Sequence, residues 1–204
     1  MKEFWDNRYA ETEFAYGEVP NKFFKKELDK LIQGKILLPA DGEGRNSVYA
    51  AKNNWESYAC DISSSGKTKA VLLAERHKTK LTYDIGDFGV LNYKQHSFDA
   101  IALIYAHFPP SKKMEYLNLV NDYLKIGGVL IFEGFSKSHL KFNTKNPKVG
   151  GPKNLDVLFS LEEVQSVFSN YSVSIAEESI IELSEGDYHI GQGSVVRFVA
   201  KKIG

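Results

Sequence analysis

The chain has one cysteine and no long apolar run, which excludes a disulfide-stabilised protein and argues against a membrane-spanning one. Cys60 has no partner for an internal disulfide, and because it sits in an apolar run we expect it to pack in the core. No stretch of about 18 uninterrupted apolar residues occurs, so no membrane-spanning helix is expected. The opening residues 1–6 lack an apolar segment of signal-peptide length, which favours a cytoplasmic protein.

An excess of charge of either sign is also absent. The 26 basic residues balance 26 acidic ones, and no block of like charge is long enough to mark a nucleic-acid arm or a polybasic membrane anchor. We therefore expect a small, roughly neutral partner. The histidines show no close ligand pairing, so no metal site is predicted; they are His77, His96, His107, His139 and His189.

The sequence does contain short apolar runs that alternate with segments of helical period. This alternation predicts βαβ units around a mainly parallel sheet, and 204 residues with 43% hydrophobic composition suit a single domain. The predicted strands span residues 35–39, 57–60, 81–83, 98–105 and 129–133, and the predicted helices span 20–33, 46–52, 66–77, 112–124 and 161–169.

The last third of the chain has a different character. Residues 172–183 and 193–202 are β-rich with no room for a helix between them, which predicts an antiparallel hairpin. We expect a doubly wound, mainly parallel seven-stranded α/β sheet that ends in this hairpin, with the ligand at the carboxyl ends of the first strands. The expected single domain divides into a cap at 1–34, a binding core at 35–135 and a substrate side at 136–204, where the polar segment 137–154 is long enough to be a functional loop.

A glycine-containing loop follows the first predicted strand, in the run Ile36 to Asn46. Gly42 and Gly44 remove the β-carbons that would keep a ligand from the main chain, and the next helix directs unpaired N–H groups at it. A dinucleotide fingerprint needs a third glycine where Ser47 stands, which counts against NAD and FAD. Gly66-Lys67-Thr68 could end the motif of a phosphate-binding loop, but this motif also needs a glycine at position 61, where Asp61 stands. A phosphate-binding loop is therefore excluded here.

Two acidic residues stand at the ends of predicted strands. Asp61 lies 17 residues after Gly44, near the offset at which a carboxylate accepts hydrogen bonds from ribose hydroxyls in such folds. An aspartate at this position is about as often the cap of the following helix. Asp87 is suited to accept from an exocyclic amine while Phe88 covers a purine face; alone, this pair is more often a turn residue beside a core aromatic.

Four stretches together resemble a class I S-adenosylmethionine-dependent methyltransferase, in the branch of the tellurite-resistance and thiopurine methyltransferase-like proteins. The resemblance covers nearly the whole chain. It rests on Phe4-Trp5-Asp6-Asn7-Arg8-Tyr9 with Phe14-Ala15-Tyr16-Gly17 and Pro20-Asn21-Lys22-Phe23, on Asp41-Gly42-Glu43-Gly44-Arg45-Asn46, on Asp61-Ile62-Ser63 with Gly66 and Lys69-Ala70, and on Phe98-Asp99-Ala100-Ile101 to Tyr105-Ala106-His107-Phe108-Pro109-Pro110 with Leu124-Lys125-Ile126-Gly127-Gly128.

The resemblance implies a Rossmann-like methyltransferase fold, S-adenosylmethionine as cofactor and a small-molecule methyl acceptor. It implies that the first glycine loop approaches the methionine part, that Asp61 holds the ribose, and that Asp87 and Phe88 hold the adenine. The N-terminal segment would fold over the cofactor. The residues expected to bind the cofactor are Arg8, Tyr16, Asp41, Gly42, Glu43, Gly44, Asn46, Asp61, Ile62, Ser63, Asp87, Phe88, Tyr105 and Ala106.

Two positions depart from the family pattern. Leu38 stands where the family often has an acid, and Ala40 stands where it usually has its first glycine. Asp41 is positioned to replace the missing carboxylate in part. A degenerate cofactor-binding or interaction module therefore stays open beside the enzyme, and a nicotinamide-dependent oxidoreductase is a weaker alternative.

Methyl transfer from a sulfonium mainly requires alignment of nucleophile, methyl and sulfur, so few side chains need a chemical role. His107 is the first candidate for a general base, with pocket shaping as its structural alternative. Trp5, Tyr9, His107 and His189 are the candidate substrate contacts: the two aromatic residues belong to an N-terminal aromatic cluster, and His189 lies between the last two predicted strands. The chemical nature of the acceptor atom, whether sulfur, oxygen, nitrogen or a metalloid, stays open.

Overall fold

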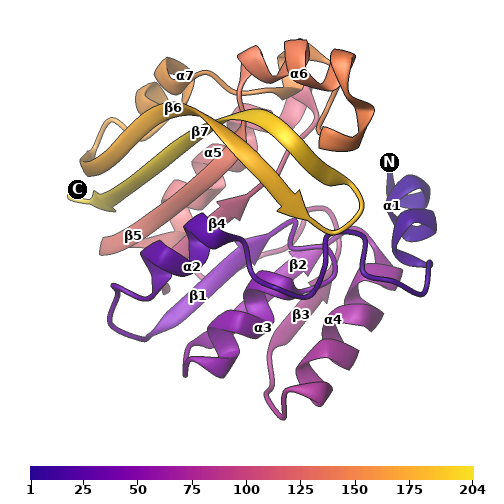
Figure 1. Ribbon diagram of the computed structural model, residues 1–204. Helices are drawn as coiled ribbons and strands as arrows, with labels where there is room; N and C mark the ends of the chain where they lie inside the picture. The colour runs from indigo at the N-terminus through magenta and orange to yellow at the C-terminus, as the bar shows by residue number, and fades with distance from the viewer.

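A seven-stranded mixed sheet forms the centre of the molecule (Figure 1). The structure is a computed structural model that describes all residues from 1 to 204. The strands lie in the order β3-β2-β1-β4-β5-β7-β6, parallel from β3 to β5, with β7 antiparallel to both of its neighbours. Their bounds are β1 Lys35–Pro39, β2 Glu56–Asp61, β3 Thr82–Ile85, β4 Phe98–Ile104, β5 Leu124–Phe135, β6 Tyr171–Glu185 and β7 His189–Lys202. This architecture confirms the predicted fold class.

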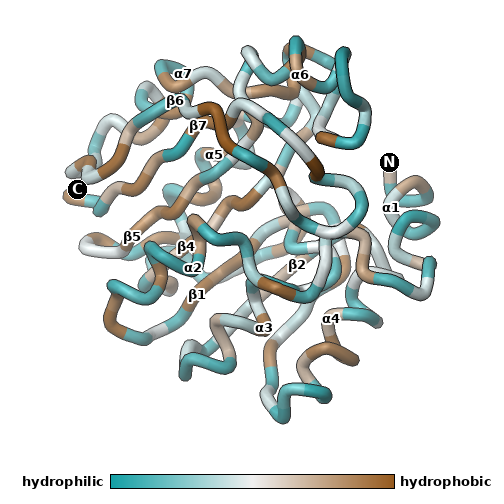
Figure 2. The backbone as a smooth tube through the Cα atoms, in the orientation of Figure 1, coloured by the Kyte–Doolittle hydropathy of each residue, from teal (hydrophilic) through white to brown (hydrophobic).

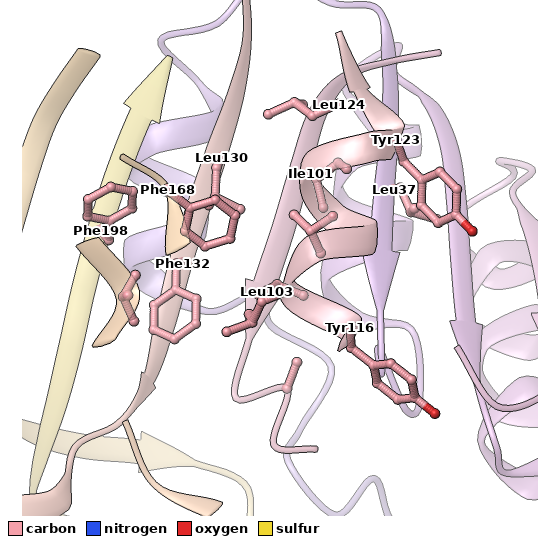
Figure 3. Close-up of a cluster of buried hydrophobic side chains, with 14 of the residues drawn as sticks. Leu37, Ile101, Leu103, Tyr116, Tyr123, Leu124, Leu130, Phe132, Phe168 and Phe198 are labelled. Atoms are coloured by element: carbon pink, nitrogen blue, oxygen red, sulfur yellow. The ribbon is translucent and has the colours of Figure 1, made fainter. Parts of the chain in front are cut away.

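Helices cover both faces of the sheet. On one face α2 (Lys22–Leu28), α3 (Arg45–Lys52) and α4 (Ser64–Arg76) bury a cluster that includes Phe24 and Leu38; on the other, α5 (Pro110–Tyr123) and α7 (Leu161–Val167) bury a larger aromatic cluster. In that larger cluster Phe132, Phe168 and Phe198 lie together, with Tyr116 and Tyr123 farther along the sheet (Figure 3). Strands that are covered on both faces need apolar residues on both faces, and brown segments run along β1, β4 and β5 in Figure 2.

Several shorter elements lie at the carboxyl edge of the parallel strands. They are α1 (Lys2–Tyr9), α6 (Leu140–Lys145) and the 3₁₀ turns Lys137–His139, Pro147–Val149 and Leu155–Val157. Figure 1 shows the tip of the β6–β7 hairpin reaching down to the N-terminal chain that joins α1 to α2, where Asp187 donates its backbone N–H to the Ala15 carbonyl at 3.1 Å. None of the helices has the length and apolar character needed to span a bilayer.

Two predicted elements differ from those observed, and one helix was not predicted. The helix expected over 20–33 is shorter, because Asn21 caps α2 and the chain tightens into i→i−3 turns at Lys30 and Leu31. The strand expected over 129–133 is longer, because residues 124–128 also belong to β5, as an irregular stretch where the register against β4 shifts. The helical form of α1 was not predicted, since its sequence has no apolar stripe and no side-chain cap.

Candidate functional site

The first glycine loop connects β1 to α3 through three left-handed residues: Ala40, Gly42 and Gly44 have φ of 55°, 60° and 85°. Ala40 thus takes the left-handed conformation that a glycine adopts easily. A β-carbon on Gly42 would lie 2.6 Å from the Tyr9 hydroxyl, and one on Gly44 would overlap Ala70 of α4. Gly44 therefore allows α3 to pack against α4, and the close approach of a ligand to its main chain stays a prediction.

Asp61 ties the ends of the first two strands together. Its side chain accepts hydrogen bonds from the backbone N–H of Gly42 at 3.1 Å and of Ser63 at 2.9 Å, and the residue is only 8% exposed. A carboxylate has about four acceptor positions, so about two are left for a ligand's hydroxyl groups. Burial raises the pKa of Asp61 against the effect of these N–H donors. Ile62 beside it is half-buried, as a residue that flanks a ligand should be.

Asp41 lies in the same loop and is the residue predicted to replace in part the acid that the family often has at the position of Leu38. It accepts the N–H of Ser47 at 3.3 Å, and desolvation raises its pKa to about 7. Leu38, at the family's acidic position, is buried in the core. The only carboxylate of this loop that is not in an ion pair is therefore Asp41, since Glu43 pairs with Lys69 at 2.8 Å.

The side chains of Glu43, Arg45 and Asn46 hold the N-terminal segment in place. Glu43 accepts from the backbone of Ala15 at 3.2 Å, Arg45 donates to the Tyr16 carbonyl at 3.1 Å, and Asn46 accepts from the backbone of Asn21 at 2.9 Å. The sequence assigned Glu43 and Asn46 to the cofactor. The structure corrects this for their side chains, which bind residues 15–21 instead.

Helix α1 covers the start of α4. Asp6 accepts from the Ser63 hydroxyl at 2.7 Å and from the backbone N–H groups of Ser64 at 2.8 Å and Ser65 at 3.3 Å, so it caps α4 from a distant part of the chain. Ser63 also caps α4 itself through Gly66. Tyr9, predicted to face the substrate, is buried against Gly42 on the side of Asp61, which is a correction of its predicted position.

The remaining N-terminal candidates contact one another. The Arg8 guanidinium lies 4.0 Å from the ring centroid of Tyr188 and 5.8 Å from that of Trp5, and it donates to the Tyr16 hydroxyl at 3.2 Å. Trp5 stacks on Tyr9 at 5.4 Å. The predicted aromatic cluster is thus divided: Trp5 and Tyr9 stack on each other, while Tyr16 lies against Tyr188 and His189 and Phe14 packs with Val48 and Leu73.

Asp87 and Phe88 lie at the end of β3 but have different surroundings. Asp87 is partly exposed and accepts from Lys112 at 2.9 Å and from Tyr116; burial opposes its ionisation, but these hydrogen bonds outweigh it and lower its pKa. Phe88 is buried, stacked near Phe108 with ring centroids 6.2 Å apart. The prediction that Phe88 covers a purine is therefore wrong, and it is the core aromatic of the alternative interpretation.

His107 has no free nitrogen. Its Nδ1 lies 3.2 Å from the Val157 carbonyl, its Nε2 accepts from the backbone N–H of Phe135 at 3.2 Å, and burial lowers its pKa to about 3. A base needs an unpaired acceptor nitrogen, so the structure corrects the prediction that His107 is a general base. Ala106 before it is also buried.

Tyr105 directly follows β4 in a left-handed conformation, with φ of 52°, and its hydroxyl is buried without a hydrogen-bond partner. Its ring lies 4.7 Å from that of Phe135 and 4.6 Å from that of His189. His139 also stacks on Phe135 at 3.9 Å. The structure thus brings His107, His139 and His189 around one phenylalanine, and no pattern in the sequence indicated His139.

Two cavities lie outside the glycine loop. One of about 390 Å³ is open between α2 and the starts of β5 and β6, lined by Glu27, Leu31 and Ile175 among others, at the opposite edge of the sheet from Asp61. A smaller one of about 60 Å³ is lined by Tyr105, Glu133 and Glu185. The larger space is thus remote from the residues on which the functional prediction depends.

The family comparison agrees with the geometry of the first five strands. Residues 36–128 match the model of a family described as a methyltransferase domain. This stretch contains Gly42, Asp61, Asp87 and Tyr105. This part of the chain is therefore similar to a methyltransferase domain. No curated protein matches its sequence.

Solved structures share the fold over the whole chain. A protein from a study of the conversion of a disulfide bond into a thioacetal group during echinomycin biosynthesis has a TM-score of 0.78 at 14% identity, covering 100% of this chain and 92% of that one. TehB from Haemophilus influenzae has a TM-score of 0.72 at 14% identity, with 98% and 66% covered. Magnesium protoporphyrin IX methyltransferase from Synechocystis PCC 6803, solved with S-adenosylhomocysteine (SAH), has a TM-score of 0.65 at 14% identity, with 98% and 83% covered. The chain therefore shares its fold with these three proteins, one of which is a methyltransferase.

Proposed function

We propose that this protein is a methyltransferase that binds S-adenosylmethionine and transfers its methyl group to a small-molecule acceptor. The observation that carries the proposal is Asp61. Its carboxylate is fixed by two backbone N–H groups where β1 and β2 end, and it keeps acceptor positions for two ribose hydroxyls. The fold similarity to TehB supports the resemblance to the tellurite-resistance and thiopurine methyltransferase-like branch and leaves the acceptor open.

The residues at this edge suit the parts of the cofactor. Asp61 would hold the ribose, partly exposed Ile62 would flank the adenine, and Asp87 would accept from the adenine amine. The loop around Asp41 and Gly42 would face the methionine part, and Tyr105 would border the methyl group. The bound cofactor supplies an activated methyl group, so the protein mainly has to position the acceptor and exclude water.

The competing functions have less support. A degenerate binding module was motivated by Leu38 and Ala40, but Ala40 keeps the conformation of a glycine and Asp41 supplies a carboxylate in the same loop. A nicotinamide-dependent oxidoreductase would need the dinucleotide fingerprint that Ser47 breaks, and Ser47 is buried, donating to the Gly44 carbonyl at 3.2 Å.

Calorimetric titration with SAH tests the proposal. We expect binding to the wild type and a loss of about 1–3 kcal/mol, roughly 5- to 150-fold in Kd, for Asp61→Asn. The matched control is Asp99→Asn, because Asp99 also accepts a backbone N–H but lies at the opposite edge of the sheet. Wild-type protein that binds NAD and not SAH would reject the proposal, and equal affinities for wild type and Asp61→Asn would reject the role of Asp61.

A further inference from the structure

We propose that Glu185 and His189 form a carboxylate–imidazole dyad in which Nε2 of His189 accepts the proton of a protic methyl acceptor. The acceptor class that fits is a hydroxyl or thiol on a small, largely apolar or aromatic body. This inference rests on the proposed function and deepens it, because it assigns a base and an acceptor class to the same site.

The two residues face each other across the β6–β7 hairpin. They are register partners in the antiparallel pair, and Glu185 Oε2 lies 3.0 Å from His189 Nδ1. Glu185 is itself fixed by Arg45 of α3 at 3.0 Å and by the side-chain amide of Asn21 at 3.0 Å. A carboxylate held in this way has one orientation toward the imidazole, and it fixes the proton on Nδ1.

His189 is the histidine of this cluster with a free nitrogen. His107 uses both ring nitrogens, and so does His139, whose Nδ1 accepts from the Ser194 backbone at 3.2 Å and whose Nε2 lies 3.0 Å from the Gly150 carbonyl. In His189 only Nδ1 is engaged, so Nε2 carries an unpaired lone pair. The base role expected at His107 moves to His189.

A glycine lies beside the edge of the imidazole that carries the free nitrogen. A β-carbon on Gly150 would lie 2.9 Å from Cδ2 and 3.4 Å from Nε2 of His189, and closer still to the Tyr188 carbonyl, so a side chain there would occupy the space beside the imidazole. Gly150 belongs to the polar segment 137–154 that was predicted to be a functional loop. This segment therefore forms the wall opposite the proposed base.

The surroundings of His189 select the acceptor. Its ring lies 4.6 Å from Tyr16, 4.6 Å from Tyr105 and 5.1 Å from Phe135, and Tyr105 borders the carboxyl end of β4 where the methyl group is expected. The nearby charges of Glu185 and Arg45 pair with each other, while Arg8 of α1 contacts aromatic rings. Walls formed by three aromatic rings favour an acceptor with an apolar or aromatic body.

The proton and electron balance is closed. The acceptor's O–H or S–H proton moves to Nε2 of His189, and its oxygen or sulfur bonds to the methyl carbon as the bond from that carbon to the sulfonium breaks, with the electron pair staying on the departing sulfur. The products are a methyl ether or thioether, neutral SAH and an imidazolium next to the Glu185 carboxylate. Loss of the sulfonium charge matches the gain of the imidazolium charge.

Nitrogen-15 NMR of His189 in the wild-type protein tests the dyad without any turnover. We expect the proton on Nδ1 and a lone pair on Nε2, and Glu185→Gln should change this tautomer balance, whereas Glu182→Gln, an exposed neighbour on the same strand, should not. A wild-type His189 with its proton on Nε2 overturns the proposal. This result is independent of SAH binding, so failure of the dyad is distinguishable from failure of the proposed function.

Activity on a panel of phenols, aliphatic alcohols and thiols provides the second readout. We expect His189→Gln to lower kcat by at least about 100-fold, the usual effect of losing a general base, with Kd for SAH within about 3-fold of wild type. His77→Gln, a histidine at the end of α4, is the matched control and should keep wild-type kcat. Wild-type kcat in His189→Gln, or a wild-type enzyme that methylates only selenite or tellurite, contradicts the proposal.

Discussion

Several residues in and near the first glycine loop have hydrogen-bond partners that the loop motif does not predict. Asp61 was predicted correctly to end its strand, because an apolar run that stops at an acid is visible in the sequence. The partners of Glu43, Asn46 and His107 were not predictable, since they lie 25–50 residues away in the chain. Side chains with distant partners need the assembled fold to define their role.

Asp41 makes stability depend on pH. Its pKa in the folded protein is about 7, against 3.8 for the free group, so between pH 4 and 7 the folded state binds the proton more tightly and stability falls as pH rises. Asp41→Asn removes this dependence. We expect the variant to be more stable than wild type at pH 8, by at most about 4 kcal/mol, and similar at pH 4.

Urea denaturation at several pH values measures this difference. Other groups with a shifted pKa, such as Glu185, are present in both proteins, so their contributions to the pH dependence cancel in the difference. A constant difference between wild type and Asp41→Asn from pH 4 to 8 contradicts the raised pKa of Asp41.

Gly44 tests whether a loop glycine serves packing or ligand approach. We expect Gly44→Ala to lower the free energy of unfolding by about 1–3 kcal/mol, because the new methyl overlaps Ala70 in a left-handed backbone. Ala70→Gly in the same chain should recover part of this loss. A Gly44→Ala variant of normal stability that fails to bind SAH would show that the ligand, not α4, requires this glycine.

At the scale of elements, the strands were easier to predict than the N-terminal segment. Strand β1 begins and ends where its apolar run does, and the β6–β7 hairpin follows from two β-rich runs with little between them. Helix α1 has no such pattern, because its stability comes from contacts with α4 rather than from an apolar stripe. Its position could therefore not be read from residues 2–9.

Asp6 links α1 to α4, and its removal should release α1. We expect Asp6→Ala to lower the free energy of unfolding by about 1 kcal/mol, the usual cost of losing a helix cap. Hydrogen exchange at the Ser64 and Ser65 amides should become faster. Glu3→Ala, an exposed acid on the same helix, is the control, and equal exchange rates in both variants would contradict the capping role of Asp6.

At the scale of the whole molecule, the N-terminal segment and the tip of the β6–β7 hairpin meet at the first glycine loop. Arg45 binds the Tyr16 carbonyl and Glu185, while Asn21 binds Glu185 and Glu133, so the cap, the central sheet and the hairpin share one buried polar network. The mainly parallel sheet and its C-terminal hairpin were predictable from the alternation of runs. The position of the cap over the loop depends on this network. From the sequence, this position could be expected only through the family resemblance.

A crystal structure with SAH tests the central claim most directly, because it shows which residues contact each part of the molecule. The account predicts ribose hydroxyls within hydrogen-bond distance of the Asp61 carboxylate, with the sulfur near Tyr105 and on the side of His189. SAH bound elsewhere, for example in the 390 Å³ cavity beside Glu27, with Asp61 left in contact only with protein, would contradict it.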